Sequence, residues 1–190
     1  MQILIPKRRM RISVLGNGDV SRPLYFLLGP IRGGGDWQHA MCLALKEHNI
    51  TPDCVIACPC RWDEEHPLAG YFLDGYDDGY FPRQLNWERH YLQMAGVERR
   101  PGCIVSMLPC ESKEEPHPGP EPYAMDTRGE LGEWRWRVKT ERARLVIGAE
   151  EGFLGLSQIK RNFDLALGHE FPVYRSIEET ARAASLIAFT

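Results

Sequence analysis

Short apolar runs alternate with longer amphipathic segments along most of the chain. The apolar runs have the length of strands that are covered on both faces, and they occupy residues 24–29, 53–57, 102–108, 144–149 and 171–174. The segments between and after them show helical spacing of apolar residues, and they occupy residues 37–48, 85–95, 127–142, 156–167 and 177–189. Strands that alternate with helices predict a parallel sheet with right-handed crossovers. We therefore expect an α/β fold, a single doubly wound domain of flavodoxin-like or Rossmann-like type with a five-stranded parallel sheet flanked by helices.

The chain has 190 residues, which is enough for one domain with a full core. The regular alternation predicts that this domain spans residues 24–190. Residues 1–23 are mixed in character, with a strand-like run at 11–15 and a turn signal at 16–19. We expect them to form an N-terminal arm or an edge hairpin.

Composition and charge narrow the classes of partner. Apolar residues make up 43% and charged residues 26%, as in ordinary soluble proteins, and the net charge of -3 disfavours a nucleic-acid backbone binder. No apolar run approaches the ~20 residues of a membrane span, and no signal peptide is expected at the start. The six cysteines lie mostly in apolar runs, which favours a reduced, cytoplasmic protein. Because Cys58-Pro59-Cys60 has no partner pair, the sequence predicts no metal site.

Ligands of open parallel sheets bind beyond the carboxyl ends of the strands, and two segments there carry candidate chemistry. Gly33-Gly34-Gly35-Asp36 lies between a strand and a helix. It is either a tight turn with Asp36 as the helix cap, or a set of backbone N–H groups for a phosphate or a sugar hydroxyl.

The second segment is Asp126–Trp134, which follows a proline-rich loop. Thr127-x-x-Glu130 matches a capping box, in which the two side chains satisfy backbone N–H groups at a helix start. Alternatively, Glu130 and Asp126 form a carboxylate pair. Such pairs cleave glycosidic bonds, because one carboxylate attacks the anomeric carbon while another acid assists the leaving group.

Several segments taken together resemble a known family. They are Tyr25–Ile31, Asp36-Trp37, Gly129–Trp134, Val146–Glu150 and Gly152-Phe153. In their order along the chain they are similar to the nucleoside 2-deoxyribosyltransferase-like proteins, and the resemblance runs from about residue 24 to about residue 175.

The resemblance implies roles for particular residues. The family's nucleophile corresponds to Glu130, which would form a covalent 2-deoxyribosyl-enzyme that a second base or water resolves. The assisting Asp corresponds to Asp126, although its distance from the Glu is shorter here than in the well-known enzymes. Glu88 is either a further carboxylate of the site or an exposed helix residue. Substrate-binding positions are expected at Gly29, Pro30, Asp36, Trp37, Glu88 and Gly129. The resemblance implies no cofactor, and it implies a homo-oligomer because family enzymes borrow residues from a neighbouring subunit.

The expected function is therefore chemistry on the N-glycosidic bond of a nucleoside or nucleotide, either base transfer or hydrolysis. The alternatives are a non-catalytic nucleotide-binding or sensing module, and a structural protein in which Glu130 only caps a helix. Two loops, 58–83 and 110–122, are expected to shape the pocket. In the first, Trp62 and Tyr71 either stack on a base or pack in the loop, and Arg61 either meets a phosphate or lies at the surface.

Overall fold

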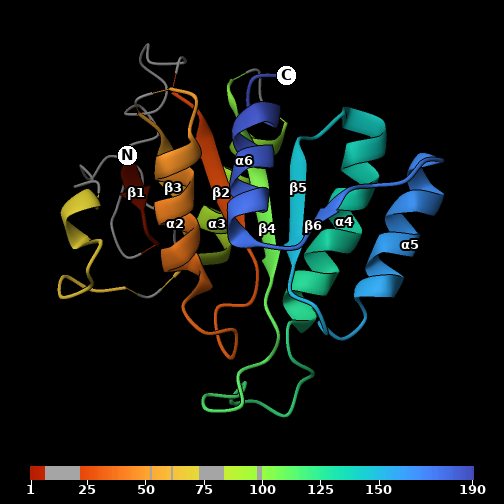
Figure 1. Ribbon diagram of the computed structural model, residues 1–190, viewed down its shortest axis with the longest axis horizontal. Helices are drawn as coiled ribbons and strands as arrows, with labels where there is room; N and C mark the ends of the chain where they lie inside the picture. Colours follow the sequence, from red (N-terminus) through yellow and green to blue (C-terminus); the bar gives the residue numbers. More distant parts are fainter. Residues whose placement is uncertain (7–21, 52, 61, 73–83, 98–99) are drawn as a thin grey trace.

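The structure is a computed structural model, and its descriptions cover residues 1–6, 22–51, 53–60, 62–72, 84–97 and 100–190. These residues form one sheet in which all neighbouring strands are parallel. The strands are β1 (Gln2–Leu4), β2 (Leu24–Leu28), β3 (Val55–Ala57), β4 (Gly102–Leu108), β5 (Leu145–Ala149) and β6 (Val173–Tyr174). Their order across the sheet is β1-β3-β2-β4-β5-β6 (Figure 1).

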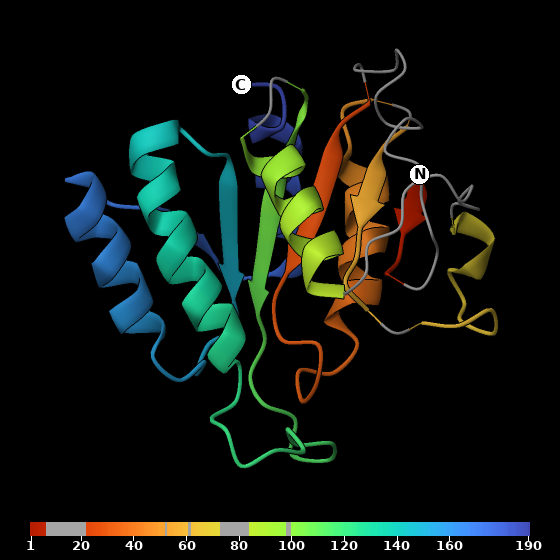
Figure 2. The ribbon, with the colours of Figure 1, turned by 180° about the vertical axis from the view of Figure 1, so that it is seen from behind.

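Helices cover both faces of this sheet. In the described ranges the α-helices are α2 (Trp37–His48), α3 (Gln84–Gly96), α4 (Met125–Glu141), α5 (Leu156–Leu167) and α6 (Ile177–Ile187). Figure 1 shows α2 and α6 on one face, and Figure 2 shows α3, α4 and α5 on the other. The α/β class and the doubly wound parallel sheet are thus confirmed.

The predicted number of five strands is wrong, because the sheet has a sixth strand at its edge. Residues Gln2–Leu4 pair in parallel with β3, and the side chains of Ile3 and Leu4 are fully buried. The N-terminal amine also lies 2.8 Å from Asp53 Oδ1. A strand of three residues has too short an apolar run to be recognised by pattern, and it forms because an edge is available to pair with. The strand-like run at 11–15 lies outside the described residues.

Two cores explain the continuous apolar runs of the strands. On one face, the core includes Trp87 and Tyr91 of α3 and Trp134 of α4. On the other face, Met41 of α2 and Ala184 of α6 are fully buried against the sheet. Since both faces are covered, each strand residue from Leu24 to Leu28 and from Gly102 to Leu108 is buried.

Two further findings concern the cysteines and the apolar character of the helices. All six cysteines are free, and only Cys110 is partly exposed. Within the described ranges, none of the helices combines the length and the apolar character that a bilayer crossing requires.

Candidate functional site

A cavity of about 530 Å³ opens at the carboxyl end of β2. Strand β2 has β3 on one side and β4 on the other, so the winding of the chain reverses at β2. Parallel sheets bind ligands at such a reversal, because the loops that leave neighbouring strands diverge to opposite faces there. The lining consists of Phe26, Leu27, Leu28, Gly29, Pro30, Ile31, Arg32, Pro59, Glu88, His117, Glu121, Pro122, Ala124, Met125, Asp126, Thr127 and Glu130.

The two loops that follow β2 and β4 pack on each other beside this cavity. Ser112 N–H donates to the Gly33 carbonyl over 2.6 Å, and Tyr123 Oη donates to the Pro109 carbonyl over 2.9 Å. A Cβ on Gly34 would lie 2.8 Å from Tyr123 Oη, so only glycine allows this approach. The glycine turn therefore serves to pack one loop on the other.

The helix that carries Glu130 begins earlier than the capping-box pattern predicts. Ala124 occupies the N-cap position with φ 57°, and α4 runs from Met125. Thr127 therefore lies inside the first turn, where its side chain is only 3% exposed. Thr127, Leu131 and Trp134 are the buried residues of α4, at a spacing that puts them on one face. Packing on the core has set the start of the helix, and the capping-box interpretation is wrong.

Asp126 and Glu130 are one helical turn apart on α4, and both line the cavity. Side chains at this spacing lie one above the other on a helix surface. Glu88 reaches the same cavity from α3, where the Gln84 side-chain amide donates to its carboxylate over 2.7 Å. Burial raises the pKa of Glu88, and the charge of Asp126 adds to this rise, while the Gln84 hydrogen bond opposes it. Three carboxyl groups from two helices thus share one cavity.

Glu130 has the most strongly shifted pKa of these carboxyl groups. Burial is the largest cause, and it contributes most to raising the pKa of Glu130 to about 7. The negative charges of Glu88, Asp126 and Glu133 raise this pKa further. The positive charge of Arg89 lowers it. Glu130 is therefore partly protonated near neutral pH, a state that is characteristic of functional carboxylates.

The structure brings five of the predicted site residues together in the cavity lining, namely Gly29, Pro30, Glu88, Asp126 and Glu130. Trp37 lies behind the lining, and its Nε1–H donates to the Pro30 carbonyl over 2.8 Å. Asp36 is exposed, occupies the N-cap position of α2 without a side-chain capping bond, and contacts His39 instead. Gly129 lies on the exposed side of α4. Among the described residues, these three therefore lie outside the cavity lining.

The cavity also contains polar residues that the sequence did not indicate. Arg32 lies in the turn after β2, and His117 and Glu121 lie in the loop after β4. The His117 N–H donates to the Glu111 carboxylate over 2.9 Å, which helps to fix the loop. The only sequence signal for these residues was the position of both loops at the carboxyl edge of the sheet.

The aromatic residues of the first long loop pack within that loop and against α2. The Trp62 ring stacks on the His66 ring at 4.0 Å, and Tyr71 Oη accepts a hydrogen bond from Lys46 Nζ over 2.7 Å. In the described part of the loop, only Pro59 lines the cavity. Trp62 and Tyr71 therefore pack rather than face a ligand there, and Arg61 lies outside the described residues.

The C-terminus lies at the end of the sheet where the strands begin, and the cavity lies at the other end. The Ala188 carbonyl accepts a hydrogen bond from Gly102 N–H at the start of β4, over 2.8 Å. Figure 1 shows the chain end at that side. The last residues therefore do not reach the cavity of their own chain.

The arrangement has the elements of glycosidic-bond chemistry. It offers a partly buried carboxyl group with a raised pKa, a second carboxylate one turn away and a third on a neighbouring helix. Environments that separate the pKa values of neighbouring carboxyl groups allow one to act as a base or nucleophile while another holds a proton.

No model of a protein family matches the chain, and no curated protein matches it.

Proposed function

We propose that the cavity binds a nucleoside or nucleotide and that Glu130 attacks its anomeric carbon, which breaks the N-glycosidic bond. The observation that carries this proposal is the position of Glu130, a largely buried carboxyl group at the reversal of the sheet, beside two further carboxyl groups. The cavity volume of about 530 Å³ lies within the range of small-molecule sites. The resemblance of residues 24–175 to the nucleoside 2-deoxyribosyltransferase-like proteins supports the same role for Glu130.

The proposed reaction has two steps. A Glu130 carboxylate oxygen forms a bond to the anomeric carbon, and the electron pair of the carbon–nitrogen bond leaves with the base. Asp126, one turn away on the same helix, assists the departing base in its proton transfer. The resulting glycosyl ester of Glu130 is then attacked by a second base, which gives transfer, or by water, which gives hydrolysis.

The environment of Glu130 suits this attack. A carboxylate held in a poorly solvated cavity is less stabilised than one in water, and it gains more from the positive charge that develops on the sugar carbon. Glu88 lies in the same cavity with a raised pKa and so retains its proton to higher pH than an ordinary Glu. Its carboxyl oxygens can accept a hydrogen bond from a sugar hydroxyl or from the base.

The direct test is incubation of the protein with deoxynucleosides, deoxynucleotides and NAD, with released base followed by chromatography and the intact protein followed by mass spectrometry. We expect release of base from at least one substrate, and a protein mass increased by the sugar moiety when the acceptor is withheld. Ligand binding without base release and without an adduct would instead establish the non-catalytic binding module.

The pH dependence of the reaction is expected to report on Glu130. A nucleophile must be ionised, so kcat/KM should fall as pH decreases below about 7, tenfold per pH unit at the limit. Glu88→Gln removes the negative charge that raises the pKa of Glu130 most, and it should shift this decrease to lower pH. The measurement is kcat/KM for base release across the pH range, for both proteins. Activity that instead decreases above pH 7 would make Glu130 a proton donor.

A further inference from the structure

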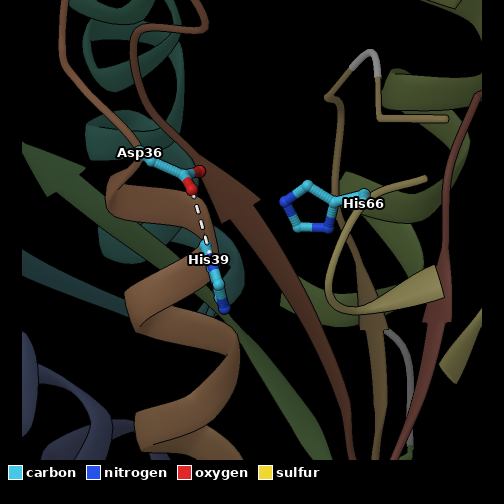
Figure 3. A group of neighbouring side chains, drawn as sticks. All are labelled: Asp36, His39 and His66. Carbon is cyan, nitrogen blue, oxygen red and sulfur yellow. Dashed lines mark hydrogen bonds and ion pairs between the residues drawn. The ribbon is translucent and has the colours of Figure 1, made fainter. Parts of the chain in front are cut away.

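We propose that Asp36, His39 and His66 form a binding site for a divalent transition-metal ion of the Zn²⁺ type, separate from the cavity. Each residue offers one ligand atom, and these atoms lie within 4.8 Å of one another. Figure 3 shows the three side chains facing a common space between the start of α2 and the segment that follows β3. None of the three residues belongs to the cavity lining.

Two of the ligands are already spaced for a metal ion. Asp36 precedes α2 and His39 lies in its first turn, so both project from the same side of the helix. Asp36 Oδ2 and His39 Nδ1 are 3.2 Å apart. Ligand atoms at about 2.1 Å from a tetrahedral Zn²⁺ ion are about 3.4 Å from each other, so this pair needs little adjustment. The ligand atom of His66 lies at most 4.8 Å from those of Asp36 and His39, and side-chain rotation can close this separation.

His66 is held facing the pair by its own segment. Its ring stacks on Trp62 with an interplanar angle of 10°, and its Nδ1 accepts a hydrogen bond from Leu68 N–H over 3.2 Å. The other ring nitrogen is therefore the one available to the cluster, and Figure 3 shows one ring nitrogen directed toward Asp36.

Metal binding has a structural consequence at His66. In the neutral ring, the Leu68 hydrogen bond to Nδ1 places the ring proton on Nε2. Coordination through Nε2 moves this proton to Nδ1, so the Leu68 N–H loses its acceptor and the turn at 66–68 rearranges. The occupied site would connect the 62–72 segment to the start of α2. Trp37 follows Asp36 directly, and its Nε1–H donates a hydrogen bond to the Pro30 carbonyl. The proposed metal site therefore adjoins the turn after β2 that lines the cavity.

The ligand set selects the class of metal. Two imidazoles and one carboxylate leave the fourth position of a tetrahedral ion to water, which is a common arrangement for Zn²⁺. Mg²⁺ and Ca²⁺ prefer oxygen ligands throughout, so they should not compete.

The test is titration of the metal-free, tag-free full chain with Zn²⁺ by calorimetry and with Co²⁺ by visible absorption. We expect one ion per chain, d–d absorption of tetrahedral Co²⁺ with nitrogen and oxygen ligands, and no displacement by excess Mg²⁺. His39→Gln and His66→Gln should each weaken binding on the order of 100-fold or more. His169→Gln is the matched control, because His169 is exposed and lies outside the cluster.

Several outcomes would overturn the proposal. One is absence of binding at millimolar Zn²⁺, and another is affinity that both variants leave unchanged. A thiolate-to-cobalt charge-transfer band would assign the ion to a cysteine instead. Circular dichroism establishes that the variants are folded, and Asp36→Asn, which alters an exposed side chain, provides a second test if a histidine variant does not fold.

Discussion

Glu130→Gln is expected to decrease the rate of base release by at least about 10³-fold, because glutamine cannot form the glycosyl ester. The substitution keeps the size and shape of the side chain, so substrate binding should persist. The measurement is steady-state base release together with mass spectrometry for the covalent adduct, which should be absent in the variant. Activity that survives this substitution would show that Glu130 is not the nucleophile.

The same variant is expected to be more stable than the wild type above pH 7. The pKa of Glu130 is about 7 in the folded protein and 4.5 as the ordinary value. Below pH 4.5 the carboxyl group is protonated in both states and has no effect on stability. As pH rises from 4.5 to 7, the unfolded chain loses this proton first, so the free energy of unfolding decreases. At 1.36 kcal/mol per pKa unit, the total decrease is about 3 kcal/mol, and glutamine avoids it.

Denaturant unfolding at about pH 4 and about pH 8 separates a functional role from a structural one. Glu130→Gln should exceed the wild type in stability only at the higher pH. Glu141→Gln is the matched control on the same helix, because Glu141 is exposed at the far end of α4 and lies outside the cavity lining. A Glu130→Gln variant that is less stable at both pH values would indicate a structural role for this carboxyl group.

Gly29→Ala is expected to lower the free energy of unfolding by about 2 to 3 kcal/mol and to weaken substrate binding. A Cβ at this position would lie 2.5 Å from the Met107 carbonyl oxygen of β4 and 2.6 Å from the Trp37 ring. Neither neighbour is free to move, because the Met107 carbonyl belongs to the sheet backbone and the buried Trp37 ring donates a hydrogen bond to the Pro30 carbonyl. The end of β2 must therefore shift, and the cavity lining shifts with it.

Gly35→Ala is the control for this prediction. Gly35 has φ 65°, but a Cβ there would meet no atom within 4 Å. The cost is then only that of the left-handed backbone, about 1 kcal/mol. The measurements are the free energy of unfolding in urea and the KM for base release, each compared between the two variants. Equal destabilisation of the two variants would contradict the close packing at the end of β2.

The regular elements of the fold were predictable because their local patterns agree with their surroundings. The span of α2 matches the prediction, as do those of β4 and α5. Each of these strands is a continuous apolar run, and each of these helices has apolar residues at helical spacing, so burial on the sheet reinforces the local preference. β1 escaped prediction, because three residues contain too little pattern and the pairing with β3 stabilises them.

At the site, the sequence placed Asp126 and Glu130 one turn apart, and position within the strand order placed them at the ligand-binding edge. It did not decide whether Glu130 caps the helix. The packing of α4 decided this question. Leu131 and Trp134 are buried on one face of α4, and Thr127 is buried with them inside the first turn. A capping motif describes only local hydrogen bonds, and core packing outweighs them.

The sequence by itself therefore determined the alternation of strands and helices, and with it the edge of the sheet where the loops meet. Only the tertiary structure decided which side chains share a space. Glu88 joins Asp126 and Glu130 because α3 and α4 pack side by side on one face of the sheet, and His66 meets Asp36 and His39 because the loop after β3 folds back on α2. Periodicity reports the face on which a residue lies, whereas contacts between distant segments depend on the packing of whole elements.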